Sequence, residues 1–139
     1  MNSRHSGVTL IELLIVMVVI AVLAAIAFPA YDGQQRRGTR AAAQSQMVNI
    51  ANRQAQFLLD ARNYALGAGA LATLNVTLPD EVARFYTVTI ENDSGGTAPT
   101  TPPTFTVRAT PIAGTRQVPD GVLTLAHNGA KTRAGNPGW

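Results

Sequence analysis

The 139-residue chain contains no cysteine, which excludes a disulfide framework and a thiolate metal site. Its two histidines, His5 and His127, are too few for a histidine zinc cluster. A glycine-rich phosphate loop before a helix is also missing, and the adjacent carboxylates Asp80 and Glu81 fit a solvated loop end better than a catalytic pair. The sequence therefore predicts no metal, no cofactor and no enzymatic activity.

Charge of either sign is scarce in the first part of the chain. Residues 8–31 carry a single charged side chain, Glu12, in an otherwise apolar run. About 20 apolar residues, rising 1.5 Å each, span a bilayer core of roughly 30 Å. A secretory signal peptide would instead have an apolar core of about 7–15 residues followed by a small-residue cleavage site. We therefore interpret this run as a membrane-spanning helix.

The next segment has helical periodicity from residue 41 to about residue 60. Its apolar positions fall near one face of a helix: Ala43, Met47, Ile50, Ala51 and Leu58. Only Pro29, Gly33 and Gly38 separate this segment from the apolar run. We predict one long helix that is bent or weakened between Pro29 and Gly38.

The second half of the chain has the alternating pattern of strands. Residues 61–82 read as an irregular loop, and strands are predicted at 85–90, 104–109 and 122–126. An Asn-Gly turn at 128–129 predicts a short fourth strand at 131–133, and the Gly/Pro-rich tail at 135–139 is predicted to be irregular. The expected fold class is α+β, with a long N-terminal helix packed on a small antiparallel sheet.

Glu12 is the residue that most requires an explanation. A carboxylate at this depth of an apolar helix costs a few kcal/mol in a membrane and usually marks function. No lysine, arginine or histidine lies within one helical turn of it in the sequence. Cleavage after Gly7 would create an α-amino group on Val8 that could pair with Glu12, within one chain or between chains, where it would set axial register. The alternative is a carboxylate that reaches the lipid headgroups from near the helix end.

The residues from Ser6 to Leu13 resemble the class III signal of type IV pilins and related pseudopilins. The resemblance covers a short basic leader ending in Gly7, then Val-Thr-Leu-Ile-Glu and a long apolar helix that continues to Tyr31. It implies that a prepilin peptidase cleaves after Gly7, that Val8 becomes an N-methylated N-terminus, and that Glu12 and Pro29 serve assembly. The implied organisation is a leader at 1–7, a transmembrane and filament-core helix at 8–31, and a globular domain at 32–139 with the pilin fold.

The remaining sequence is most similar to the minor pilins of the twitching-motility system, above all in the stretch from Asp120 to Lys131 and in the terminal Trp139. Those relatives often carry cysteines where this chain has Asp120 and Gly138. The resemblance therefore implies that their C-terminal disulfide loop is absent here. Burial of Trp139 is one contact that could hold the tail in its place.

The function that this resemblance implies is a structural subunit of a type IV pilus, major or minor, used for adhesion, twitching motility or DNA uptake. The alternative is a pseudopilin of a type II secretion system. Secretion pseudopilins often bind calcium, and Glu91 with Asp93 offer too few oxygens for that ion. The implied partners are other pilin subunits, the prepilin peptidase and the inner-membrane assembly machinery. The implied location is the inner membrane before assembly and the extracellular filament afterwards.

A small cluster of basic residues follows the apolar run. Arg36, Arg37 and Arg40 stand in a chain of net charge +3 and isoelectric point near 10.0, which is weak evidence for an anionic partner. We favour the interpretation that these arginines pair with carboxylates of neighbouring subunits in a filament. Contact with DNA or another anionic surface ligand, as in a DNA-binding pilin, is the alternative.

Overall fold

The computed structural model describes residues 8–139, except for the side chains of Pro29 and Ala30. The chain forms two compact units, one ending at Gln35 and the other beginning at Arg36. Helix α1 (Leu10–Ala61) contributes residues to both units, and its helical backbone continues through Gly33 and Gly38. The single long helix is therefore confirmed, whereas its predicted bend stays a prediction.

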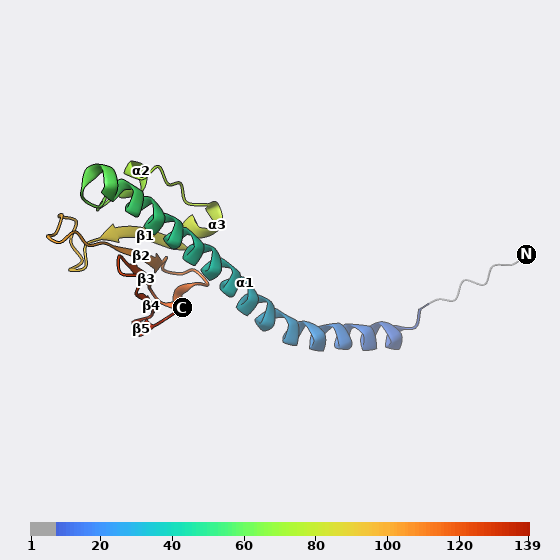
Figure 1. Ribbon diagram of the computed structural model, residues 1–139. Helices are drawn as coiled ribbons and strands as arrows, with labels where there is room; N and C mark the ends of the chain where they lie inside the picture. The colour runs from blue at the N-terminus through green and yellow to red at the C-terminus, as the bar shows by residue number, and fades with distance from the viewer. Residues whose placement is uncertain (1–7) are drawn as a thin grey trace, which may run out of the picture. The chain divides into compact units, whose positions relative to one another are not determined.

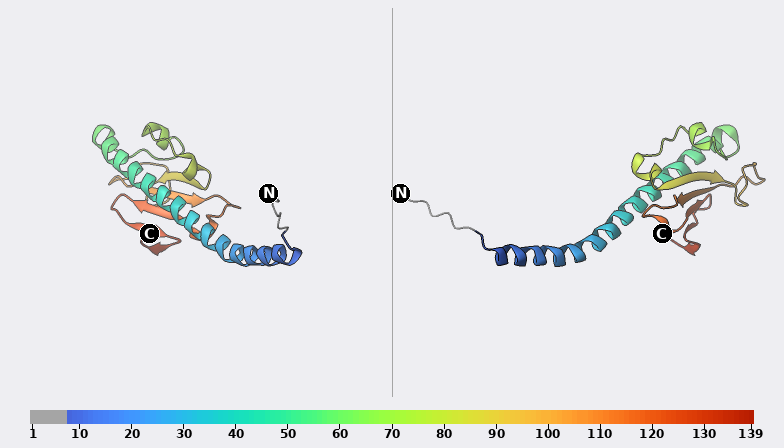
Figure 2. Two further views of the ribbon diagram at one scale, coloured as in Figure 1. Left: turned by 90° about the vertical axis from the view of Figure 1, so that its right-hand side faces the viewer. Right: turned by 180° about the vertical axis from the view of Figure 1, so that it is seen from behind.

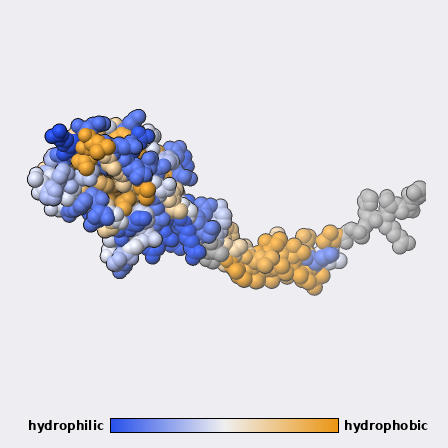
Figure 3. Space-filling view, in the orientation of Figure 1, coloured by the Kyte–Doolittle hydropathy of each residue, from blue (hydrophilic) through white to orange (hydrophobic). Residues whose placement is uncertain are grey.

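In the first unit, α1 exposes the side chains of its apolar run. The large apolar residues from Leu10 to Phe28 are each about half exposed or more, and the helix is long and apolar enough to cross a membrane. Figure 3 shows these residues as an apolar surface, in contrast to the largely hydrophilic surface of the second unit. An apolar surface of this size on a helix requires a lipid or protein environment.

The second unit contains a five-stranded antiparallel sheet in the order β1-β2-β3-β4-β5. Its strands are β1 (Tyr86–Glu91), β2 (Thr106–Pro111), β3 (Leu123–Ala126), β4 (Lys131–Arg133) and β5 (Asn136–Pro137). A 3₁₀ turn, η1 (Val118–Asp120), precedes β3. The part of α1 that belongs to this unit lies diagonally across one face of the sheet (Figures 1 and 2).

The core lies between α1 and that face of the sheet. Ala43, Met47 and Ile50 are buried on the helix, as their periodicity predicts. The strands bury alternate residues against them, namely Tyr86, Val88, Ile90, Val107, Ala109, Leu123 and Leu125. Fully buried Gln54 was not predicted; its side chain bonds to both the N–H and the C=O of Ala65 and so fixes the loop after the helix.

Two predictions about the segments after α1 were wrong in part, one about the loop at 61–82 and one about where the second strand begins. The segment predicted as a loop at 61–82 contains the single-turn helix α2 (Ala70–Thr73) and the start of another, α3 (Asp80–Ala83). These two helices bury Ala70 and Val82. These turns were missed because their apolar residues are too few to establish a helical period. The strand predicted at 104–109 is displaced by two residues. Thr104 lies in the preceding loop, where its N–H donates to the Thr100 hydroxyl and its own hydroxyl accepts from the N–H of Asp93.

The tail at 135–139 contains the short strand β5, where the sequence predicts an irregular end. Ala134 and Gly135 both have positive φ, at 50° and 82°, which is the requirement of a two-residue type I′ hairpin turn. Arg133 thereby pairs with Asn136. Pro137 suggested a non-strand, but a proline is tolerated on an edge strand because no further strand needs its missing N–H.

Gly121 fixes the position of this hairpin. Its φ of 68° and ψ of −175° lie in a region essentially restricted to glycine. A Cβ built on Gly121 would approach the Cβ of Ala134 to 2.6 Å, and the N–H of Ala134 donates to the carbonyl of Val122 at 2.8 Å. The turn of the β4–β5 hairpin is therefore seated directly on Gly121.

We expect Gly121→Ala to destabilise the protein by about 3 kcal/mol or more, from backbone strain and the clash with Ala134. Gly114→Ala is the matched control, because Gly114 also has a positive φ of 78° but nothing lies within 4 Å of its added Cβ. It should cost only the strain of the left-handed backbone, about 1 kcal/mol. Thermal unfolding measures both; equal losses would show that the close approach at Gly121 is unimportant.

Candidate nucleic-acid interface

The register of the sheet brings basic side chains to its β4–β5 edge. Ile90 pairs with Val107, Val107 with Leu125, and Leu125 with Lys131. A second row of cross-strand partners, next to the first, runs from Val88 through Ala109 and Leu123 to Arg133 and Asn136. Cross-strand partners point to the same face. Lys131, Arg133 and Asn136 are thus on the face that packs on α1, but all three are exposed.

Trp139 anchors the chain beside these residues. Its indole N–H donates to the carbonyl of Thr124 at 3.0 Å, and the Lys131 ammonium lies 4.5 Å from the centre of its ring. The N–H of Gly138 donates to the carbonyl of Lys131 at 2.8 Å. Trp139 is half-buried, so its contact with the sheet holds the tail without a disulfide.

The three arginines of the sequence cluster have different environments. Arg37 is exposed on α1, whereas Arg36 is half-buried and its carbonyl accepts a hydrogen bond from Gln117. Arg40 forms an ion pair with Asp120, with 2.9 Å between Nη1 and Oδ1. Since residues three apart are neighbours on a helix surface, Arg37 extends the basic flank that Arg40 begins.

Asp120 is the centre of a polar cluster beneath this flank. Gln117 is fully buried, and its amide donates to Asp120 at 2.8 Å and lies 3.1 Å from the Tyr86 hydroxyl. Burial raises the pKa of Tyr86 above its ordinary value, so the phenol stays neutral and the hydroxyl remains a hydrogen-bond partner. The cluster joins α1, β1 and η1, and it places Asp120 where the resembling minor pilins carry a cysteine.

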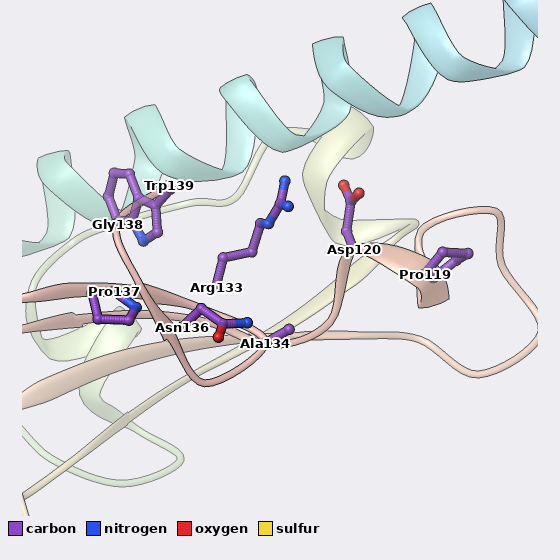
Figure 4. A pocket seen from close by; sticks show the side chains of 8 residues that line it. All are labelled: Pro119, Asp120, Arg133, Ala134, Asn136, Pro137, Gly138 and Trp139. Atoms are coloured by element: carbon purple, nitrogen blue, oxygen red, sulfur yellow. The ribbon is translucent and has the colours of Figure 1, made fainter.

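Arg133 and Asp120 line the same surface pocket, of about 470 Å³, together with Asn136 and Trp139. In the view of Figure 4, the Arg133 side chain stands between Trp139 and Asp120 and points toward α1. Asp120 is already neutralised by Arg40, and no ion pair involves Arg133 or Lys131 among the described residues. The open side of the pocket is therefore positively charged.

Acidic residues gather at the opposite edge of the sheet. Asp80 and Glu81 open helix α3, which contacts β1; Glu91 ends β1, and Asp93 follows it. Cations on this side are compensated, since Arg108 lies 3.2 Å from Glu91 and Arg84 lies 4.0 Å from Asp80. The second unit therefore has one edge where cations predominate and one where carboxylates balance them.

The other residues proposed from the sequence belong to the N-terminal segment. Gly7 lies outside the described residues. Val8 is exposed, and the backbone N–H of Glu12 donates to the Thr9 hydroxyl at 3.3 Å. Pro29 lies within α1, but its side chain is not described. The assembly and processing roles of these residues remain predictions.

Two family models match the chain. The model of the type IV minor pilin ComP, DNA uptake sequence receptor, matches residues 29–120, which is more than half of the sequence, and the prokaryotic N-terminal methylation motif matches residues 2–28. The chain belongs to the ComP family of type IV minor pilins. This membership confirms the pilin resemblance and identifies the protein as a structural pilus subunit, not an enzyme.

A solved type IV pilin from Shewanella oneidensis is also similar, at 22% identity and a TM-score of 0.49, over 75% of this chain and 98% of that one. No curated protein sequence matched the pilin. The family match ends at Asp120. Strands β3 to β5, with the basic edge, lie beyond it, so their role must be inferred from this pilin's own residues.

Sequence reasoning singled out Arg36, Arg37 and Arg40 but missed Lys131, Arg133 and Asn136 as candidate contacts. A signal for two of them was present. The Asn128–Gly129 turn fixes the hairpin register that pairs Leu125 with Lys131 and Leu123 with Arg133. Asn136 could not be found in this way, because its strand depends on the unusual Ala-Gly turn.

We expect Asp120→Ala to destabilise the pilin by about 3 kcal/mol, because it leaves the largely buried Arg40 and Gln117 without their shared acceptor. Asp80→Ala is the control, since that carboxylate is 91% exposed and its pair with Arg84 spans 4.0 Å. Exposed pairs contribute little. Chemical denaturation of both variants measures the difference; similar midpoints would contradict a structural role for the Arg40–Asp120 pair.

Proposed function

We propose that this pilin binds double-stranded DNA at the β4–β5 edge and presents that edge on an extracellular pilus for DNA uptake. The family to which it belongs is described as a DNA uptake sequence receptor. The observation that carries the proposal is the separation of charge, with Arg37, Lys131 and Arg133 exposed on one side and the carboxylates at the other. Of the three pilus functions left open by the sequence, this favours DNA uptake over adhesion and twitching motility.

Phosphate contacts explain how such an edge would hold DNA. Lysine and arginine side chains release condensed counterions from the duplex, which supplies most of the sequence-independent affinity. The Lys131 ammonium is held 4.5 Å from the centre of the Trp139 ring, so this cation loses less freedom when it binds a phosphate. We therefore assign Arg37 to DNA contact in place of pairing with a neighbouring subunit, since Arg37 and Lys131 are both exposed.

For maturation we propose the route implied by the methylation motif. The prepilin peptidase cleaves after Gly7 and Val8 is N-methylated, while the apolar helix holds the subunit in the inner membrane as a single span. The assembly machinery then moves it into the pilus, where the apolar surface of α1 packs on other pilin helices. The new amino group of Val8 pairs with Glu12 and sets the register of the incoming subunit.

Glu12→Val should leave membrane insertion and processing intact, because a more apolar helix inserts at least as well. Incorporation should fail, since breaking a buried ion pair typically costs about 3–5 kcal/mol. Fractionation with intact-mass analysis should find processed, methylated protein that begins at Val8 in the inner membrane and little in sheared pili. Incorporation of Glu12→Val at the wild-type level would show that apolar packing alone sets the register.

Replacing both Arg37 and Lys131 with glutamine should weaken binding to every duplex sequence. The measurement is the affinity of the full-length pilin, in detergent micelles, for a fluorescent duplex over a series of salt concentrations. Each lost phosphate contact lowers the slope of log affinity against log salt by about 0.9, so the double variant should lose about two.

The matched control replaces Arg53 and Arg62 with glutamine. Both are exposed, their replacement removes the same total charge, and Arg53 lines a separate surface pocket that also includes Asp60. This control should keep the wild-type slope. An equal loss in the two double variants would mean that only net charge matters, and that the β4–β5 edge is not the DNA site.

A further inference from the structure

The tip of the β4–β5 hairpin carries two side chains suited to reading bases. Arg133 and Asn136 flank the Ala134–Gly135 turn, pair directly across the two strands and are both exposed. Arginine donates two hydrogen bonds to O6 and N7 of guanine, and asparagine makes a matching pair with N6 and N7 of adenine. These are the two commonest chemical matches for a guanine and an adenine in the major groove.

We propose that this hairpin enters the major groove, with Arg133 reading a guanine and Asn136 reading an adenine at a neighbouring base pair. The inference rests on the proposed DNA binding and adds sequence recognition by named residues. Directly paired residues on one face have Cβ atoms roughly 5 Å apart. Successive bases rise about 3.4 Å along a strand, so the two side chains fall within reach of adjacent base pairs.

The shape of the hairpin suits the groove. The major groove of B-form DNA admits a two-stranded β-ribbon; because β4 also pairs with β3, the hairpin would approach the groove by its β5 edge. Strand β5 is the outermost strand of the sheet, so among the described residues no further strand covers its outer side. The pocket beside Arg133 leaves space around the guanidinium, and Arg40 neutralises the one carboxylate that lines it.

The hairpin is also rigid before it binds. Ala134 is seated on Gly121 and bonded to Val122, while Trp139 and Gly138 hold the far end of the hairpin to Thr124 and Lys131. A hairpin backbone held at both ends loses less conformational freedom on binding, and it fixes the points from which Arg133 and Asn136 extend. Lys131, stacked on Trp139, is placed to hold a phosphate at the groove wall, which separates its role from that of Arg133.

The test selects bound duplexes from a library with a randomised central segment, using the full-length pilin in micelles. Wild-type protein should enrich a site with a guanine next to an adenine. Arg133→Ala and Lys131→Ala each remove one cation from β4 and make a matched pair. Lys131→Ala should weaken all sequences equally, whereas Arg133→Ala should reduce the preference for guanine by about 10- to 100-fold.

Asn136→Ala, which changes no charge, should remove the adenine preference by a similar factor. In the enriched duplex, 7-deazaguanine removes the N7 acceptor. This replacement should weaken the wild-type protein but leave Arg133→Ala unaffected. Thermal unfolding of the variants checks that these exposed substitutions preserve the fold.

The outcomes distinguish the two levels of the proposal. Binding without any sequence preference, or a preference unchanged in Arg133→Ala and Asn136→Ala, would overturn base readout by the hairpin while leaving DNA binding in place. If wild-type pilin fails to bind the duplex library at low salt, both the proposed function and the base readout are wrong.

Discussion

The antiparallel register is the constraint on which the proposed DNA-binding edge depends. Two rows of cross-strand partners begin as buried apolar residues in β1, β2 and β3, and they end as Lys131, Arg133 and Asn136 in β4 and β5. Because side chains alternate with a period of two, a shift of one residue would turn these groups to the other face. The register that buries the apolar core therefore also determines the positions of Lys131 and Arg133.

Polar contacts replace a covalent link at the C-terminal end. By the resemblance described above, related minor pilins often carry cysteines at the positions that Asp120 and Gly138 hold here. Asp120 instead bonds to Arg40 of α1 and to buried Gln117, and the Trp139 indole bonds to the carbonyl of Thr124. The two contacts fix the segment before β3 and the end of the chain, so the hairpin between them is held from both sides. Its rigidity is independent of redox conditions.

The sequence predicted the elements whose periodicity is long and regular. The long helix, its buried face at Ala43, Met47 and Ile50, and the strand at residues 131–133 were all found. It could not predict β5, because the turn at Ala134–Gly135 lacks the usual asparagine or aspartate and Pro137 argues against a strand. The polar cluster was also hidden, since Gln117 is buried and Asp120 half-buried by tertiary contacts that no local pattern records.

In the candidate site too, local sequence patterns revealed some residues and tertiary contacts determined the others. Arg37 was visible as part of a run of arginines, yet the ion pair that occupies Arg40 depends on a residue 80 positions away. Lys131, Arg133 and Asn136 become candidate DNA contacts only because the strand register places them on the sheet face that packs on α1. The sequence favoured filament contacts for these arginines and left an anionic partner as the alternative, whereas the fold supplies the basic edge on which the proposed DNA site rests.

The most direct test of this account is to map the DNA contact on the full-length pilin by NMR, with a duplex added to the protein in micelles. The account predicts that amide and side-chain shifts change around Lys131, Arg133, Asn136 and Trp139, and on α1 near Arg37. Changes centred instead on Asp80, Glu91 and Asp93, with the β4–β5 hairpin unaffected, would contradict it.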